Sequence, residues 1–274
     1  MEKFQLIPFL EIEGIGAASG IVCENNSLFI ISDNSILLYH YTLTEKKYEK
    51  IKLFENVPEV LAKKDKPDFE AITLFDNKLY LFGSGSTKKR NTRVAFNLVN
   101  NEIKEKDLSK IYKRLIESIS IADNDLNIEG VIITDETTYF FQRGNGLNAS
   151  NGVFCYDRKS KTVQFKPITL ATINGISATF TDAILIDDTI YFLAAAENTT
   201  STYDDGEVMG SIIGTIDLKT MKLKSSIQIS DKHKFEGLTL DKKTATQTEL
   251  LICEDNDTEE LSSTIYKLIM ECNY

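Results

Sequence analysis

The chain consists largely of short hydrophobic and β-branched runs separated by tight polar turns, which is the pattern of antiparallel β-hairpins. The clearest hairpin runs from Phe69 to Phe75, turns at Asp76-Asn77-Lys78 and returns from Leu79 to Ser84. One or two further alternating strands follow each hairpin, as in residues 36–41 and 48–54 after the first one. Four strands per unit predict the blade of a β-propeller.

Five short motifs open these hairpins at a regular spacing, with a polar residue at the centre of each. They are Ala18-Ser19-Gly20, Phe69-Glu70-Ala71, Ile128-Glu129-Gly130, Thr181-Asp182-Ala183 and Phe235-Glu236-Gly237. A period of about 54 residues indicates a radial repeat architecture. We therefore predict an all-β, five-bladed propeller of four-stranded blades that open near residues 18, 69, 128, 181 and 235.

The two ends of the chain are expected to close the ring. The last repeat supplies three strands, at residues 238–240, 250–253 and 263–270, so residues 4–10 are its natural fourth strand. We expect a single propeller domain over residues 1–274. Two irregularities interrupt it: helical spacing of apolar residues over 107–119 predicts a short inserted helix, and the polar stretch 198–210 predicts a long loop.

Composition narrows the classes of partner. Lys and Arg total 31 against 41 Asp and Glu, and the net charge of −10 disfavours nucleic acid and anionic lipid but suits a cation. No apolar run approaches the roughly 18 residues of a membrane span. We expect a monomer without membrane or nucleic-acid partners. Its expected compartment is the cytoplasm, or a secreted or periplasmic location if a signal peptide has been removed.

The hairpin-opening residues are candidate metal ligands. In a propeller blade the first strand lines the central channel, so these polar side chains should converge at one mouth of it. Carboxylates placed that close repel one another unless a cation compensates, and many oxygens without His or Cys suit Ca²⁺. We predict Ca²⁺ held by Ser19, Glu70, Glu129, Asp182 and Glu236. The alternative is that these side chains accept backbone hydrogen bonds or pair with lysines, and so tie the blades together.

A second, less regular polar set follows the second strand of each hairpin, at the same channel mouth. Within it Asp33, Arg143 and Glu197 are candidate catalytic residues, the arginine to hold an oxyanion and the acids to position or deprotonate water. Arg143 could instead pair with the acidic ring. Other basic residues near this rim that could bind an anionic ligand are Lys88, Lys89, Arg90 and Arg93.

The remaining candidates for chemistry are few. His40 is expected to be structural and His233 to lie in a surface loop, which makes a Ser-His-Asp mechanism unfavourable. The four cysteines are widely spaced, unlike a zinc site, and are expected to be mostly small buried hydrophobes.

The motifs around Ser19, Glu70, Glu129 and Glu236 resemble those of the calcium-activated nucleotidases, or apyrases. The segments Asn77-Lys78-Leu79-Tyr80 and Lys234-Phe235-Glu236-Gly237 are also similar to that family, and the Glu-Gly openings are similar to the wider phytase-like and esterase-like propellers, which include bacterial families of unassigned function. The resemblance implies a five-bladed propeller around a central calcium. The chain departs from the nucleotidase pattern at Thr181-Asp182, where that pattern has a hydroxyl, and at Asp33, which no arginine follows.

Two functions are compatible with these features. The first is a Ca²⁺-dependent phosphohydrolase or esterase that acts on a small anionic substrate at the channel mouth. The second is a noncatalytic propeller in which the ion is structural and the rim binds a ligand or a protein.

Overall fold

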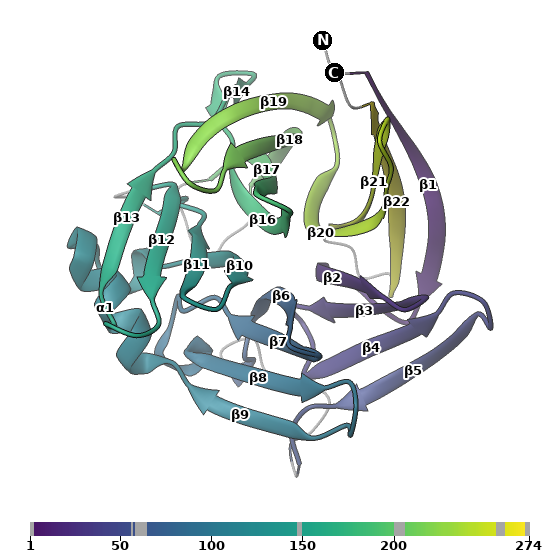
Figure 1. Cartoon of the computed structure of the whole chain (residues 1–274), viewed down its shortest axis with the longest axis horizontal. Helices are drawn as coiled ribbons and strands as arrows, with labels where there is room; N and C mark the ends of the chain where they lie inside the picture. Colours follow the sequence, from purple (N-terminus) through teal and green to yellow (C-terminus); the bar gives the residue numbers. More distant parts are fainter. Residues whose placement is uncertain are drawn as a thin grey trace.

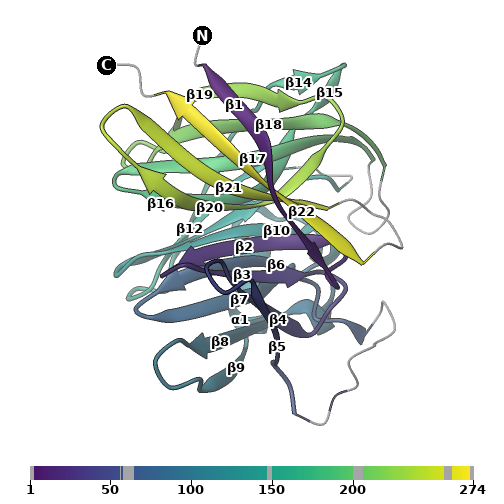
Figure 2. The same cartoon turned by 90° about the vertical axis from the view of Figure 1, so that its right-hand side faces the viewer.

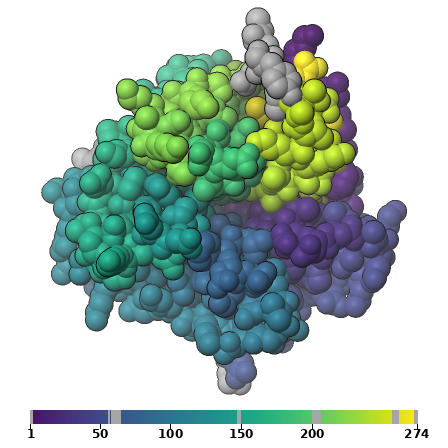
Figure 3. Space-filling model, in the orientation of Figure 1, coloured from purple at the N-terminus to yellow at the C-terminus, as the bar shows by residue number. Residues whose placement is uncertain are grey.

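Five four-stranded antiparallel sheets surround a central axis as the blades of a propeller (Figure 1). The computed structural model describes residues 3–55, 57, 65–146, 150–199, 206–255 and 261–271, and the statements below concern these residues. Consecutive repeats of the sequence form neighbouring blades, as the colour order around the ring in Figure 3 shows. The predicted five-bladed, all-β architecture is confirmed.

Each blade begins at the axis with its first strand and ends at the periphery with its fourth. Blade one comprises β2 (Ala18–Glu24), β3 (Ser27–Ser32), β4 (Leu37–Thr42) and β5 (Lys47–Lys52). Blade two comprises β6 (Phe69–Phe75), β7 (Lys78–Gly83), β8 (Thr92–Asn97) and β9 (Ile103–Asp107). Blade three comprises β10 (Ile128–Ile133), β11 (Thr137–Gln142), β12 (Gly152–Asp157) and β13 (Val163–Pro167). Blade four comprises β16 (Thr179–Ile186), β17 (Thr189–Asn198), β18 (Glu207–Asp217) and β19 (Lys222–Ser230).

The fifth blade joins the two ends of the chain, as predicted. It contains β20 (Lys234–Lys243), β21 (Gln247–Asp255), β22 (Ser262–Glu271) and, at its outer edge, β1 (Phe4–Glu13). β1 pairs antiparallel with β22 from Phe4↔Met270 to Glu13↔Ser262. Figure 2 shows the purple N-terminal strand crossing beside the yellow C-terminal one. The ring is therefore closed by backbone hydrogen bonds between segments that are most distant in sequence.

The hydrophobic core lies between the blades. Each of the five junctions has its own cluster of buried side chains, such as Phe141, Phe180 and Phe192 between blades three and four. These three rings pack edge to face, with centroids 5.2 and 5.1 Å apart. Because both faces of each blade are covered by its neighbours, the strands are apolar on both sides. This packing holds the starts of the inner strands in fixed positions around the axis.

Of the two predicted irregularities, the inserted helix is confirmed, and the long loop is wrong at its described ends. The predicted helix is present as α1 (Ser109–Ile119), and the Asp107 carboxylate accepts a hydrogen bond from the Ser109 amide at 2.8 Å at its start. Tyr112 and Leu115 bury one side of α1 in the junction of blades two and three. No helix in the described ranges is long and apolar enough to span a bilayer.

The predicted loop at 198–210 is wrong at both of its described ends. β17 extends through Asn198 and β18 begins at Glu207, because these residues pair with each other as Asn198↔Glu207. Residues 200–205 of the predicted loop lie outside the described residues. A short two-stranded sheet of β14 (Thr172–Ile173) and β15 (Ile176–Ser177) completes the fold.

Candidate metal centre at the propeller axis

A β-bulge interrupts the inner strand of every blade near its start. The pairing register shifts between Ala18 and Gly20, Phe69 and Ala71, Ile128 and Gly130, Phe180 and Asp182, and Phe235 and Gly237. A bulge re-aims a side chain, so the five bulged residues are the structurally equivalent set. They are Ser19, Glu70, Glu129, Thr181 and Glu236. In blade four the predicted member Asp182 was thus one residue out of register, and Thr181 takes its place.

The two bulged hydroxyls connect neighbouring blades. Ser19 Oγ donates a 2.6 Å hydrogen bond to the Phe69 carbonyl of blade two, and Thr181 Oγ1 donates one of 2.6 Å to the Phe235 carbonyl of blade five. Both hydroxyls are buried. For Ser19 the geometry matches the alternative role of tying blades together.

We expect Thr181→Val to lower the free energy of unfolding by about 1–2 kcal/mol, because it leaves the buried Phe235 carbonyl without this donor while conserving side-chain volume. Thr172→Val is the matched control, since Thr172 is an exposed strand residue. Urea denaturation of the two variants and the parent protein measures the difference. Equal midpoints for both variants would contradict the role of Thr181 as a tie.

Asp182 also joins blades rather than facing an open site. Its carboxylate accepts hydrogen bonds of 2.7 Å from the Ala183 amide and 2.7 Å from the Leu238 amide of blade five. Burial raises the pKa of this carboxyl well above its ordinary value, and the two backbone donors act in the opposite direction. Both oxygens of Asp182 therefore have partners within the protein.

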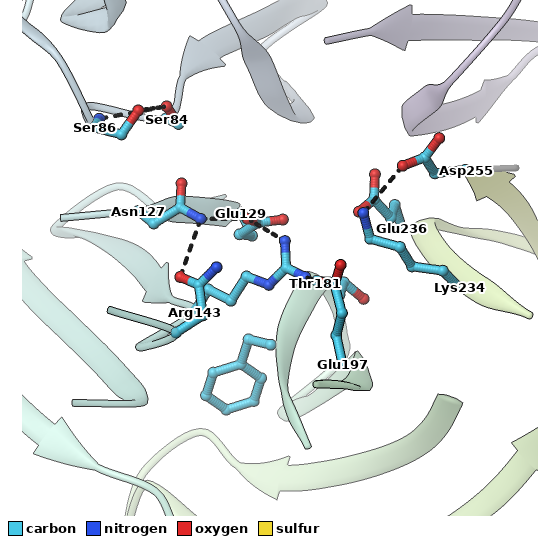
Figure 4. A network of polar contacts seen from close by, with 12 residues as sticks. Ser84, Ser86, Asn127, Glu129, Arg143, Thr181, Glu197, Lys234, Glu236 and Asp255 are labelled. Atoms are coloured by element: carbon cyan, nitrogen blue, oxygen red, sulfur yellow. Dashed lines mark hydrogen bonds and ion pairs between the residues drawn. The ribbon is translucent and has the colours of Figure 1, made fainter. Parts of the chain in front are cut away.

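Arg143 lies between two carboxylates, which is the pairing with the acidic ring that the sequence offered as the alternative to oxyanion binding. It follows β11, and its Nη1 is 3.1 Å from Glu129 Oε1 while its Nη2 contacts Glu197 Oε2 (Figure 4). All three side chains are buried. The second Glu197 oxygen accepts a 2.7 Å hydrogen bond from the Gly206 amide. The structure thus brings two of the predicted catalytic residues together, but as an ion pair that links blades three and four.

A second buried ion pair belongs to blade five. Lys234 Nζ lies 3.0 Å from Glu236 Oε1 and 3.1 Å from Asp255 Oδ2. Burial opposes the charge on Lys234, but its acidic neighbours, Glu236 foremost, outweigh burial and raise the pKa of the ammonium well above its ordinary value. Figure 4 shows this group to the right of Arg143 and Glu129. Glu236, a predicted calcium ligand, therefore already has a cation of the protein beside it.

The third cation at the axis is Arg90. It lies in a short 3₁₀ helix (Lys88–Arg90) after β7, and its Nη1 is 2.7 Å from Asp68 Oδ2. The Ser84 hydroxyl donates to the same Asp68 oxygen at 2.5 Å. Of the basic residues near the rim, Arg90 is 5% exposed, whereas the exposed Lys89 pairs with Asp65. Arg90 is buried because it neutralises an acid that precedes the inner strand.

Asp68, although paired with Arg90, lies beside two further acids. Asp33 follows β3, Asp68 precedes β6 and Glu70 is the bulged residue of β6, and one carboxylate oxygen from each lies within 4.8 Å of the other two. Asp33 Oδ1 is buried without a hydrogen-bond partner among the described residues. The side chain of Glu70 forms no hydrogen bond or ion pair within the described ranges. We call Asp33, Asp68 and Glu70 the three-carboxylate cluster.

Burial and the crowding of these acids raise the pKa values of Asp33 and Glu70. Burial, reinforced by Asp255 and Asp68, raises the pKa of Asp33 to about 7. Burial and the neighbouring acids, Asp68 first, raise the pKa of Glu70 well above its ordinary value. Among the described residues at the axis, the three internal cations are Arg90, Arg143 and Lys234. The seven carboxylates around them are Asp33, Asp68, Glu70, Glu129, Glu197, Glu236 and Asp255. The excess of negative charge is concentrated at the three-carboxylate cluster.

Sequence reasoning missed Asp68, Asn127 and Lys234, which share one position. Each lies two residues before a bulged glutamate, and side chains two apart in a strand point to the same face. Asn127 Nδ2 donates to Glu129 Oε1 at 2.7 Å, and Lys234 pairs with Glu236. The recurring pattern of a polar residue, an apolar residue and a glutamate was the available signal. Asp255, at the end of β21, belongs to the second polar set, whose residue types vary from blade to blade.

The two histidines lie away from the three-carboxylate cluster. His40 stacks on Phe29 with centroids 4.7 Å apart and shares a 3.0 Å hydrogen bond with Ser27, contacts that suit the structural role expected for it. His233 lies in the loop between β19 and β20, as predicted, and its half-buried ring places Nδ1 2.5 Å from Glu254 Oε1. Of the cysteines in the described ranges, Cys253 is buried and Cys23 and Cys155 are partly exposed.

Fold and site together define a five-bladed β-propeller with a buried, acid-rich polar network at one end of its axis. Residues 14–270 match the model of the "Family of unknown function (DUF6929)", and the chain belongs to that family. No curated protein matches the chain.

Solved structures similar to the chain include a luciferin-regenerating enzyme, with TM-score 0.50 and 9% identity over 97% of this chain and 95% of the other. They also include the glutaminyl cyclase of Myxococcus xanthus, with TM-score 0.57 and 9% identity over 98% of this chain and 97% of the other. At such identity the likeness concerns the fold alone. Neither is a calcium-activated nucleotidase, so the resemblance to that family holds for the propeller fold and is not extended to its activity.

Proposed function

We propose that the protein binds a hard divalent cation, Ca²⁺ in the first instance, at the three-carboxylate cluster of Asp33, Asp68 and Glu70. The observation that carries the proposal is the meeting of three carboxylates within 4.8 Å, one of them with a buried and unpartnered oxygen. Carboxylate oxygens are the ligands that Ca²⁺ prefers, and a cation would offset their mutual repulsion.

This proposal moves the predicted calcium site to one side of the axis. Of the five predicted ligands it keeps Glu70, because Ser19 and Asp182 bond to neighbouring blades, and Glu129 and Glu236 bond to internal cations. It adds Asp33, which the sequence placed among catalytic residues, and Asp68, which the sequence did not single out. The Lys234 ammonium lies near Asp33 and limits how many further acids can serve the ion.

We expect chelator-treated protein to bind Ca²⁺ in isothermal titration calorimetry, and Glu70→Gln to weaken that binding at least tenfold. Glu70 is the informative position because it has no partner within the described ranges, so its replacement breaks no internal contact. Glu117→Gln on the surface of α1 removes the same charge far from the axis and should leave the affinity unchanged. Absence of Ca²⁺ binding by the parent protein would overturn the proposal.

A second candidate function is ester hydrolysis at the same cluster, favoured by the meeting of three carboxylates that would hold a catalytic cation. A bound cation would supply polarisation of a phosphoryl or acyl oxygen. Arg143 and Glu197 would have no direct part in such chemistry, because they are buried in an ion pair with each other.

A screen of nucleotides, phosphate esters, carboxylic esters and lactones in the presence of Ca²⁺ tests the second candidate. We expect turnover that Asp33→Asn abolishes, while the distant Glu117→Gln variant keeps the parent rate. If no substrate is turned over although Ca²⁺ binds, the cation is structural or serves ligand binding, and the first candidate alone stands.

A further inference from the structure

A pocket of about 410 Å³ lies at the junction of blades two and three, and Ile111 of α1 is part of its lining. Cationic side chains dominate its lining: Arg93, Lys106, Arg158, Lys159 and Lys161. Asp135 is the one acid among its described lining residues. Such a concentration of positive charge stands out in a chain with a net charge of −10. The pocket shares no residue with the three-carboxylate cluster.

Two of these cations face each other directly. Arg93 on β8 and Lys106 on β9 are cross-strand partners in the antiparallel register of blade two. Like charges placed opposite each other on neighbouring strands destabilise a sheet. The fold therefore maintains a repulsive pair at this position, which an anion between the two side chains would convert into an attractive arrangement.

The protein provides little internal neutralisation. None of the five cations forms an ion pair within the described ranges, and Arg93 Nε is buried without a hydrogen-bond partner there. The Arg93 guanidinium stacks over the Tyr80 ring at 4.8 Å, and Arg158 lies over Phe75 at 5.3 Å. Arg158 also donates from Nη1 to the Thr134 carbonyl, which fixes its guanidinium. Aromatic rings and backbone carbonyls orient these cations but leave their charge uncompensated.

The pKa values of Lys106 and Arg93 are both lowered in this pocket. Burial lowers the pKa of Lys106, and Arg93, Lys161 and Arg158 lower it further. Burial also lowers the pKa of Arg93; Tyr80 opposes this shift, and Arg158 adds to it. Both shifts express the same cost of holding several cations together in a partly enclosed space.

We infer that this pocket is a binding site for a small anion with two or more negative charges, such as a diphosphate or a di- or tricarboxylate. The pocket has the volume of a small-molecule site, and its arginines can bind planar oxyanions through paired N–H groups. Tyr156 and Ile111 supply an apolar side for the body of such a ligand. The site is independent of the proposed cation site.

Calorimetric titration at low ionic strength, with inorganic pyrophosphate in one arm and citrate in the other, tests the inference. We expect at least one probe to bind the parent protein, and the double variant Arg93→Gln/Lys106→Gln to weaken that binding at least tenfold. Binding of pyrophosphate alone identifies a phosphate ligand, and binding of citrate alone identifies a carboxylate ligand. Without any probe, the double variant should melt at the same temperature as the parent protein or higher, because a repulsive pair is removed.

Two matched variants serve as controls. Lys224→Gln removes a positive charge on β19 of blade four and should leave probe binding unchanged. Glu70→Gln should also bind the probe as the parent does, which separates this site from the cation site. The inference is overturned if neither probe binds the parent protein, or if the double variant binds as tightly as the parent.

Discussion

Replacing Arg143 by methionine should lower the free energy of unfolding by about 3–5 kcal/mol, since removal of one partner leaves buried charges without compensation. Arg143 contacts Glu129 and Glu197 from a position that is 6% exposed, and it connects blades three and four. Burial opposes the charge of the guanidinium, but the two glutamates outweigh it and keep its pKa above the ordinary value. Replacing a solvent-exposed arginine at a channel mouth would not lower the free energy of unfolding by this amount.

Urea denaturation of Arg143→Met, Glu197→Gln and the double variant measures this coupling. The two single losses should sum to more than the loss of the double variant, because each single change leaves the other side chain unpaired. Arg114→Met on the exposed surface of α1 is the control and should change stability by less than about 1 kcal/mol. A similarly small loss for Arg143→Met would show that the ion pair is not buried in solution.

The second large effect concerns pH. In calcium-free protein the free energy of unfolding should fall as the pH rises from about 4 to about 7, the interval between the ordinary pKa of an aspartate and that of Asp33 in the fold. Over this interval the folded protein holds a proton on Asp33 that the unfolded chain has released. A rise in pH therefore favours unfolding. The loss is on the order of a few kcal/mol, since one pKa unit corresponds to about 1.4 kcal/mol.

The charged groups around Asp33 determine how much of this pH dependence of stability a single substitution can remove. Asp255 and Asp68 raise the pKa of Asp33, whereas Lys234 and Lys66 lower it. Glu70 and Glu236 have pKa values shifted in the same direction. Asp33→Asn should therefore flatten the curve in part and raise stability at pH 7–8, while Asp188→Asn, an exposed surface change, should leave the curve unaltered.

Denaturation in the presence of a chelator at several pH values, repeated with Ca²⁺, measures this dependence. Added Ca²⁺ should restore stability above pH 7 if the ion binds at the three-carboxylate cluster. A curve for Asp33→Asn that coincides with that of the parent protein would contradict the assigned proton affinity of Asp33.

The fold could be predicted because the spacing of the repeats and the alternation of apolar residues can both be read directly from the chain. Alternating apolar runs determined the hairpins, and five equally spaced motifs determined the number of blades. The short last repeat and the apolar strand at residues 4–10 led directly to the pairing of β1 with β22. The loop at 198–210 was mispredicted because its polar residues extend two strands whose pairing with each other stabilises them.

The sequence by itself determined the blades, the closure and the concentration of acidic residues at one end of the axis. Tertiary structure decided which acids are compensated: backbone amides bind Asp182, buried cations bind Glu129 and Glu236, and Asp33 and Glu70 remain. It also decided the register by which Thr181, not Asp182, is the bulged residue. The reason is that charge compensation depends on distances between blades, and residues from different blades are separated by dozens of positions in the chain.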